Sequence, residues 1–220
     1  MNAFSSQPVR SRDSSSEADL IDLSAPDNTE LVRGAPIWIE ALWFFVGLPI
    51  LRSHLIPWSG LRRVVLRIFG AQIGTGVHIK PGLRVKFPWY LSVGDYSWLG
   101  EDLWIDNLAR VTIGAHCCLS QGAYLCTGNH DWSSANMRLF SKPITCERGS
   151  WIGARATLCP GVVVGAGAMV AVGSVITANV PAMEIHAGVP AHFIKRRTIL
   201  SPRTEDELGL RASKVKGVPR

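Results

Sequence analysis

The chain has 220 residues, of which 47% are hydrophobic and 18% charged, and its formal net charge is +6. This is enough apolar material for one folded domain with its own core. The basic residues are scattered, with no stripe interleaved with aromatic residues, which argues against a nucleic-acid-binding protein. The five cysteines are an odd number without a CxxC pair. They predict neither a disulfide framework nor a zinc ribbon, and they fit a reducing cytoplasm.

The N-terminal third divides into a polar and an apolar part. Residues 1–33 are polar, lack the apolar core of a signal peptide, and are predicted to be a flexible tail. Residues 34–70 are predicted to form an apolar and basic helical segment. Its apolar stretch, residues 37–51, is shorter than the roughly 20 residues of a membrane span. Two interpretations stay open: a helix packed on the end of the domain, or a peripheral contact with the inner face of the membrane, flanked by Trp58 and several arginines.

From residue 73 onward, aliphatic residues recur every six positions. A period of six does not fit an amphipathic helix, but it fits a solenoid whose coils have three sides, each a short parallel strand. We therefore predict an all-β solenoid of about five triangular coils over residues 71–181. The predicted inward positions, of which 14 of 15 are Ile, Leu or Val, are Ile73, Ile79, Val85, Val93, Leu99, Ile105, Ile113, Leu119, Leu125, Cys146, Ile152, Leu158, Val164, Val170 and Ile176.

One corner of the solenoid is predicted to be enlarged in successive coils. The step between inward positions is six within a coil but eight at the first two coil-to-coil transitions, so the same corner gains two residues twice. Between Leu125 and Cys146 that corner gains many more, which predicts an extruded loop over residues 128–143. Residues 182–220 are predicted to be a C-terminal segment and tail, with a short helix from Ser201 onward.

Five motifs follow one another along the chain: Leu66-Arg67-Ile68-Phe69-Gly70-Ala71, Phe87-Pro88-Trp89, Gly128-Asn129-His130-Asp131, Trp151-Ile152-Gly153 and Gly188-Val189-Pro190-Ala191. The repeat over residues 73–195, more than half of the chain, resembles the hexapeptide-repeat acyltransferases, and the ordered motifs are most similar to the branch typified by colanic-acid biosynthesis acetyltransferases. The resemblance implies left-handed coils, acetyl-CoA as co-substrate, no required metal, and a homotrimer with sites in clefts between subunits.

The predicted chemistry is centred on His130, at the start of the extruded loop. Moving an acyl group from a thioester to a hydroxyl requires a base for the hydroxyl proton, and imidazole titrates in the useful range. The resemblance implies that His130 is this base, whereas an isolated loop histidine would be a solvated side chain. The other ring nitrogen must donate to a fixed partner, which the sequence does not identify. Asn129 and Asp131 are predicted to bind the acceptor or to orient the base.

The remaining predicted site residues come from neighbouring coils. Asp106 and Asn107 occupy the same corner one coil below and are predicted to bind acceptor hydroxyls or orient His130, although a plain turn role for Asn107 stays open. The sequence lacks the closely spaced pair of histidines that related zinc sites use, so no zinc site is predicted. The resemblance implies acetyl-CoA contacts at Trp151, Ala154, Val172, Ser174, Thr177 and Lys195.

Two positions depart from the pattern of many relatives, which carry Ala where Val172 stands and a basic residue where Ala178 stands. These departures leave the contacts of the cofactor phosphates open, and Trp151 could instead be a wall-packing residue.

The function predicted from these residues is acetyl-CoA-dependent O-acetylation of a sugar hydroxyl during exopolysaccharide or cell-surface glycan assembly. Two alternatives stay open. The first is an acetyltransferase for another small acceptor, such as an antibiotic, an amino acid or an amino-sugar nitrogen. The second is a scaffold or membrane-surface protein without catalysis. The identity of the acceptor sugar does not follow from the sequence.

Overall fold

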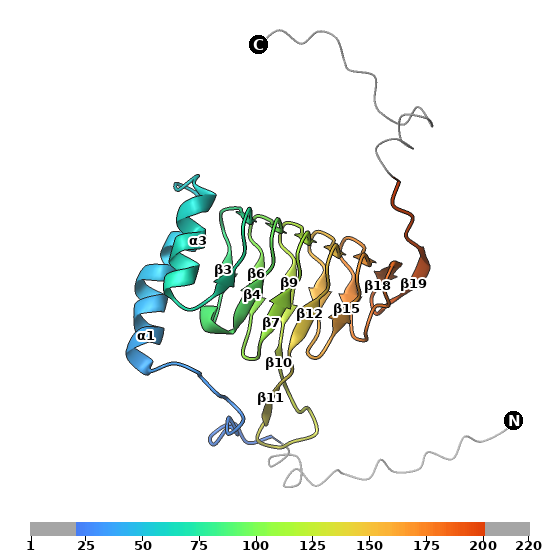
Figure 1. Cartoon of the computed structure of the whole chain (residues 1–220). Helices are drawn as coiled ribbons and strands as arrows, with labels where there is room; N and C mark the ends of the chain where they lie inside the picture. The colour runs from blue at the N-terminus through green and yellow to red at the C-terminus, as the bar shows by residue number, and fades with distance from the viewer. Residues whose placement is uncertain (1–20, 201–220) are drawn as a thin grey trace, which may run out of the picture.

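The computed structural model describes residues 21–200, and its central part is a parallel β-helix (Figure 1). Strands of two or three residues alternate with turns, and each coil contributes one strand to each of three sheets, called here faces A, B and C. Face A contains β1 (Gln72–Ile73), β4 (Leu91–Val93), β7 (Val111–Ile113), β12 (Ile144–Cys146) and β15 (Val163–Val164). Face C contains β3 (Arg84–Val85), β6 (Trp104–Asp106), β9 (Tyr124–Cys126), β14 (Thr157–Leu158) and β17 (Val175–Ile176).

Face B is the longest sheet, because two strands beyond the last complete coil continue it. These strands, β18 and β19, form an antiparallel pair at the C-terminal end. Face B contains β2 (His78–Ile79), β5 (Trp98–Leu99), β8 (Cys118–Leu119), β13 (Trp151–Ile152), β16 (Met169–Val170), β18 (Glu184–Gly188) and β19 (Ala191–Arg196).

The coils stack in the register that the repeat predicts. After the long insertion, β12 pairs with β7 so that Cys146 lies opposite Ile113, which confirms the predicted restart of the repeat. Every predicted inward side chain is buried, and the most exposed of them, Ile73, is only 8% exposed. Five coils are complete, and a sixth begins where Val180 bridges to Val164. The inward side chain of each strand therefore fills the narrow interior together with buried corner residues such as Leu83 and Leu103, which are both 0% exposed.

Glycines at the corners allow successive coils to approach closely. A Cβ atom added at Gly94 would lie 2.5 Å from the backbone nitrogen of Ala115, and one added at Gly100 would lie 2.6 Å from that of Gln121. Both neighbours are backbone atoms of the next coil, so they cannot move aside without breaking the stack. These two positions need glycine because they lack room for a side chain.

The predicted helical segment before the solenoid is confirmed, and it covers the open end of the first coil (Figure 1). It is anchored by Trp43, which is 2% exposed and donates from Nε1 to the carbonyl of Val85 at 3.0 Å. Among residues 21–200, no helix is both long and apolar enough to cross a bilayer. The elements of this cap are α1 (Ile37–Leu42), a π-helical turn η1 (Trp43–Gly47), α2 (Leu48–Arg52) and α3 (Ser59–Ile68).

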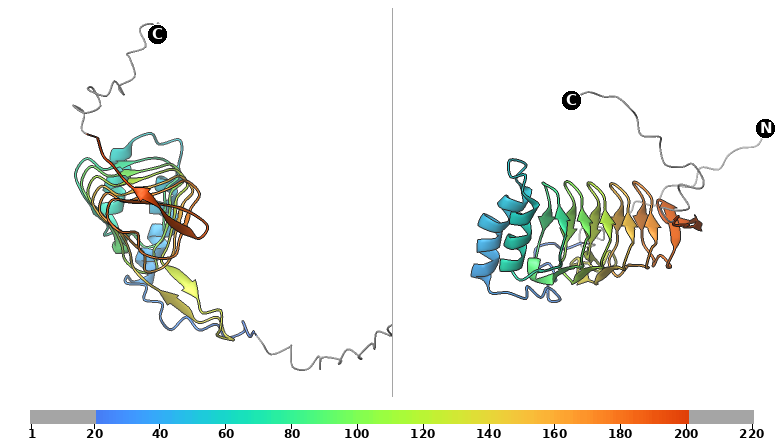
Figure 2. Two further views of the ribbon diagram at one scale, coloured as in Figure 1. Left: turned by 90° about the vertical axis from the view of Figure 1, so that its right-hand side faces the viewer. Right: turned by 45° about the horizontal axis from the view of Figure 1, so that its top comes forward.

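The long insertion leaves the solenoid at the corner between faces C and A as an antiparallel hairpin of β10 (Gly128–His130) and β11 (Leu139–Ser141) (Figure 2). Residues 21–33 were expected to belong to a flexible tail, but they lie alongside this hairpin and form hydrogen bonds with it. The amide of Leu139 donates to the carbonyl of Asp27, and the amide of Asp22 to that of Ala135, each at 2.8 Å. The hairpin offers unpaired backbone groups, and the polar segment satisfies them.

The described residues after the last coil form a β-hairpin rather than a helix. The edge of β16 offers unpaired backbone groups, and β18 pairs with it in parallel before β19 turns back (Figure 1). This edge explains why the chain extends face B here. The short helix expected from Ser201 onward lies outside the described residues.

The glycine contacts predict a sharp contrast between two substitutions. Gly94→Ala places Cβ against the Ala115 backbone, so it should lower the free energy of unfolding by about 2 kcal/mol or more. Gly60→Ala, in α3, meets only the flexible Arg63 guanidinium at 3.7 Å, so it should be neutral or stabilising. Thermal unfolding of both purified variants checks this, and equal melting temperatures would contradict the close-stacking explanation.

Candidate active site

His130 lies on β10, where the hairpin leaves the third coil, and its orientation is set by a backbone carbonyl. Its Nδ1 atom is 2.6 Å from the carbonyl oxygen of Met137, across the hairpin. A carbonyl oxygen can only accept a hydrogen bond, so Nδ1 carries the proton and the neutral ring keeps its lone pair on Nε2. The turn between β10 and β11 thus provides the orienting group that sequence reasoning could not identify.

Local hydrogen bonds hold the Met137 carbonyl in place. Met137 has a φ angle of 52°, and its amide donates to the carbonyl of Ser134 at 3.0 Å. The carboxylate of Asp131 accepts from the hydroxyl of Ser133 at 2.5 Å and from the guanidinium of Arg138 at 3.0 Å. Hydrogen bonds from Ser133 lower the pKa of Asp131, which keeps it ionised. Asp131 therefore faces the turn and shapes it, rather than contacting His130.

A pocket of about 400 Å³ opens beside His130. Asn129 lines it and accepts the His130 backbone amide on Oδ1 at 2.8 Å. The carboxylate of Asp106 lies 3.6 Å from Nζ of Lys86 and accepts a hydrogen bond from the hydroxyl of Tyr124 at 3.3 Å. Burial raises the pKa of Tyr124, so the phenol stays protonated and can donate. The structure thus brings His130, Asn129 and Asp106 together around one pocket.

Asn107 is turned away from this pocket. It is fully buried, and its Oδ1 accepts the backbone amides of Lys86 at 3.1 Å and of Phe87 at 3.0 Å. Its Nδ2 donates to the carbonyl of Phe87 at 2.6 Å. These bonds join the corners of the first and second coils. Asn107 therefore has the turn role, because its side chain stabilises the backbone of the corner below. It reaches neither the pocket nor His130.

The predicted cofactor residues lie mainly on face B and at the corner after it. Trp151 stands on β13, is 39% exposed, and donates from Nε1 to the hydroxyl of Ser120 at 3.0 Å. Ala154 and Val172 occupy the stacked corner between faces B and C, where the Gly173 amide donates to the Ala154 carbonyl at 2.9 Å. Val172 is 71% exposed. This corner is open and can be approached by a ligand.

The other three predicted cofactor residues have different surroundings. Lys195 is exposed on β19, and Thr177 is exposed just after β17. Ser174 is only 1% exposed, and its hydroxyl accepts the Gly188 amide at 3.2 Å. In this structure Ser174 holds the C-terminal hairpin against the last coil, and its hydroxyl does not face solvent.

A single chain does not bring the predicted base and all the predicted cofactor residues together. His130 leaves the solenoid at the corner between faces C and A, whereas Trp151 projects from face B and Ala154 lies at the corner between faces B and C. Face C separates these two edges of the prism (Figure 2). One ligand can reach both His130 and Ala154 only by wrapping around the prism or by lying between two copies of the chain.

Sequence reasoning missed several residues of the His130 pocket. Tyr124 and Lys86 could have been found from the register, because each adjoins an inward residue of face C. Asn28 and Leu31 could not, because they belong to the segment expected to be a tail. Within residues 21–200, no group of three or more His, Cys, Asp or Glu side chains is arranged to hold a metal ion.

Comparison with known proteins places this geometry in a family. No family model matches the chain. It is 39% identical over 184 residues to WcaF of Escherichia coli K12, whose name describes a colanic acid biosynthesis acetyltransferase; the match covers 81% of this chain and 97% of WcaF. It is 26% identical over 137 residues to the galactoside O-acetyltransferase of the same organism, covering 61% of this chain and 68% of that protein.

A solved structure shows the same fold. The hexapeptide-repeat acetyltransferase VCA0836 of Vibrio cholerae, in complex with acetyl-coenzyme A, superposes with a TM-score of 0.66 at 21% identity, covering 78% of this chain and 98% of that one. The similarity to WcaF and the shared fold lead to one conclusion. The chain belongs to the acetyltransferase family that contains WcaF, and it has the parallel β-helix fold of the hexapeptide-repeat acetyltransferases.

Proposed function

We propose that this protein transfers the acetyl group of acetyl-CoA to a sugar hydroxyl during exopolysaccharide or cell-surface glycan assembly, with His130 as the general base. The observation that supports the proposal is the hydrogen bond from Nδ1 of His130 to the carbonyl oxygen of Met137, which leaves Nε2 free to accept a proton. The names of two relatives support the substrate class, since one refers to colanic acid and the other to galactoside O-acetylation.

The proposed reaction begins when Nε2 of His130 takes the proton of the acceptor hydroxyl. The acceptor oxygen then attacks the thioester carbonyl, and a backbone amide near the site stabilises the oxyanion. When the tetrahedral intermediate collapses, the carbon–sulfur bond breaks and the imidazolium returns its proton to the CoA thiolate. The Nδ1 hydrogen bond to Met137 keeps the ring fixed through both transfers. Asp106 and Asn129 are placed to bind other hydroxyls of the acceptor.

For the donor, we propose that acetyl-CoA runs along the later coils past Trp151, Ala154, Val172 and Thr177. The small side chain of Ala154 permits close approach of the pantetheine arm. Lys195 is the cation proposed for the cofactor phosphates, and exposed Arg196 beside it can add charge. Arg197 is already engaged, because it donates to the carbonyls of Gly149 at 3.2 Å and Gly167 at 2.9 Å.

We propose a homotrimer in which each site is completed by a neighbouring copy. The separation of His130 from Ala154 within one chain supports this arrangement. Face B supports it too, because Trp98 is 61% exposed and Trp151 is 39% exposed. Such outward aromatic side chains are frequent at interfaces between subunits.

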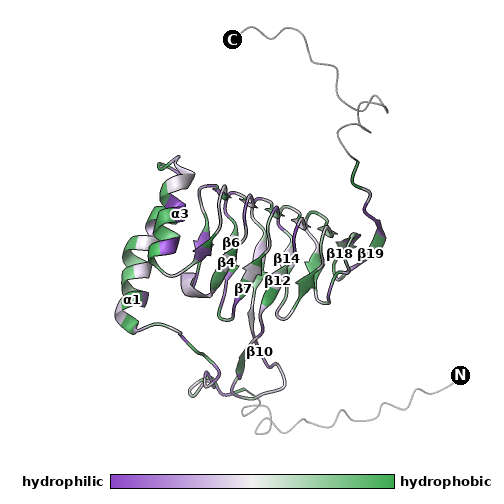
Figure 3. Ribbon diagram, viewed as in Figure 1, coloured by the Kyte–Doolittle hydropathy of each residue, from purple (hydrophilic) through white to green (hydrophobic). Residues whose placement is uncertain are grey.

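We also propose that the cap contacts a membrane surface through residues 37–51. Ile37 is 75% exposed and Phe45 74% exposed, and hydrophobic residues are spread along the cap helices (Figure 3). Exposed Arg52, at the end of this stretch, is suited to anionic headgroups.

Replacing His130 tests the proposed base. His130→Ala should lower acetyl transfer to a glycan acceptor by roughly 10² to 10⁴-fold, because the acceptor proton loses its base. Asp131→Asn probes the turn while leaving the imidazole in place, and it should retain more than about a tenth of the activity. CoA-thiol release measures both variants. Equal activity of His130→Ala and wild type would remove His130 from its role.

Subunit mixing tests the composite site. His130→Ala and Ala154→Trp should each be inactive, the second because indole blocks the pantetheine path. If every site needs His130 from one copy and Ala154 from its neighbour, random equimolar mixed trimers should recover about a quarter of wild-type activity. Recovery requires unfolding and refolding the two variants together. No recovery in mixed trimers verified by mass spectrometry would show that each site lies within one subunit.

A further inference from the structure

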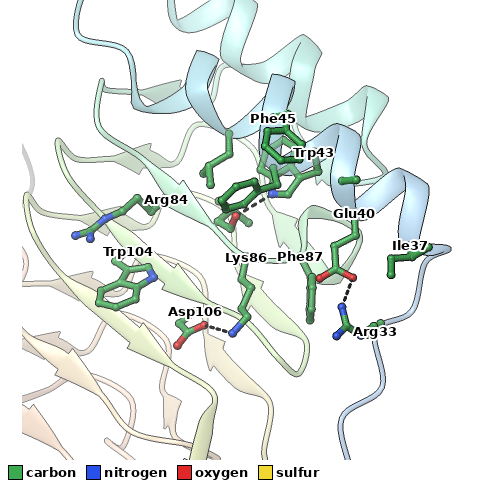
Figure 4. Close-up of a pocket in the computed structure, with 14 residues that line it drawn as sticks. Arg33, Ile37, Glu40, Trp43, Phe45, Arg84, Lys86, Phe87, Trp104 and Asp106 are labelled. Carbon is green, nitrogen blue, oxygen red and sulfur yellow. Dashed lines mark hydrogen bonds and ion pairs between the residues drawn. The ribbon is translucent and has the colours of Figure 1, made fainter.

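A second pocket, of about 600 Å³, lies beside the His130 pocket, between the cap helices and face C. Phe44 and Phe45 of the cap line it on one side and Trp104 on the other (Figure 4). Lys86 and Asp106 line both pockets, so the two meet at this ion pair. We call the two adjoining pockets the groove, with His130 at one end and the apolar cap at the other.

The middle of this groove carries cations beside an aromatic ring. The Arg84 guanidinium lies 4.6 Å from the ring centroid of Trp104, and within residues 21–200 no carboxylate forms an ion pair with it. Lys86 stands on the same wall with Nζ 3.6 Å from Asp106, while Arg33 is paired with Glu40 at 2.7 Å. Arg84 with Lys86 is therefore suited to a phosphate, which both side chains bind well.

The far end of the groove is apolar and open. Phe44 is 60% exposed and Phe45 74% exposed, and their rings meet edge to face at 5.2 Å. Ile37, 75% exposed, lines the same pocket and adds to this apolar surface. Contiguous exposed apolar groups of this kind mark binding surfaces. A hydrocarbon chain bound at this end would be removed from water.

The order along the groove is a base, a polar pocket, positive charge and an apolar surface. We infer that the second pocket binds the phosphate and the first hydrocarbon units of an acceptor whose glycan is joined through phosphate to a long hydrocarbon chain. The inference rests on the proposed function, since it places the acetylated glycan at His130. Arg84 and Lys86 contact the phosphate, and Phe44 and Phe45 contact the chain.

Calorimetric titration of the full-length protein with farnesyl monophosphate tests this site. Phe45→Ser and Arg84→Gln should each weaken binding by roughly tenfold or more, because one removes apolar contact and the other a charge-assisted hydrogen bond. Leu55→Ser is the matched control for the first, because Leu55 is 93% exposed on the cap but does not line the pocket. Arg148→Gln, exposed on the fourth coil, is the control for the second. Both controls should bind like wild type.

Several outcomes would overturn the inference. The first is that the probe does not bind, and the second is that the control variants weaken its binding as much as Phe45→Ser and Arg84→Gln do. The third is that farnesol binds as tightly as farnesyl monophosphate. The fourth is that dihexanoylphosphatidylglycerol binds as tightly as the probe and depends equally on Phe45, which would assign the pocket to bilayer lipid. His130→Ala should bind the probe like wild type. Full activity of His130→Ala would contradict the proposed base, whereas failure of the wild-type protein to bind the probe would contradict this site. The two failures are therefore distinguishable.

Discussion

The stacking of coils in strict register is the constraint on which the rest of the structure depends. The interior is closely packed with the inward strand residues and buried corner residues, and glycine corners keep successive backbones within contact. Extra residues can therefore leave the prism only at a corner, without shifting the pairing above and below. The pairing of Cys146 with Ile113 shows that the long hairpin leaves the register intact. A catalytic element can thus be inserted without loss of core packing.

The same stacking places the chemistry. Face C aligns Arg84, Trp104 and Tyr124 on successive coils, and their rings and guanidinium stack outward, with 4.4 Å between the Trp104 and Tyr124 centroids. Asp106 extends from the same face toward the hairpin. The ring orientation of His130 is fixed separately, by the Met137 carbonyl across the hairpin. The site therefore combines side chains positioned by the solenoid with one tautomer selected by the hairpin turn.

The fold could be predicted from the sequence because the period of six is a direct imprint of the three-sided coil. Its register also predicted that Asp106 would lie beside His130. The contact of Met137 with His130 could not be predicted, because it depends on a left-handed backbone conformation within an irregular turn. Likewise, the pairing of Asp27 with Leu139 joins backbone groups, and backbone pairing of irregular segments carries no side-chain signature.

Two assignments show where residue type alone misleads. Asn107 and Ser174 stand at positions expected to contact ligands, yet both side chains are buried and bind backbone groups of neighbouring elements. Small polar residues suit tight corners and ligand contacts equally, so burial must decide between the two roles. Lys86 shows the reverse case, because it follows an inward residue without any motif and still lines both pockets.

The hairpin holds His130 as the tautomer with a free Nε2. Nitrogen-15 NMR of the full-length protein with labelled histidine, at a pH where the ring is neutral, can distinguish the two tautomers. We expect one histidine with a protonated Nδ1 and an unprotonated Nε2, whose signals disappear in His130→Gln. If the signals lost in that variant instead show a protonated Nε2, the ring cannot accept the acceptor proton, and His130 is not the base.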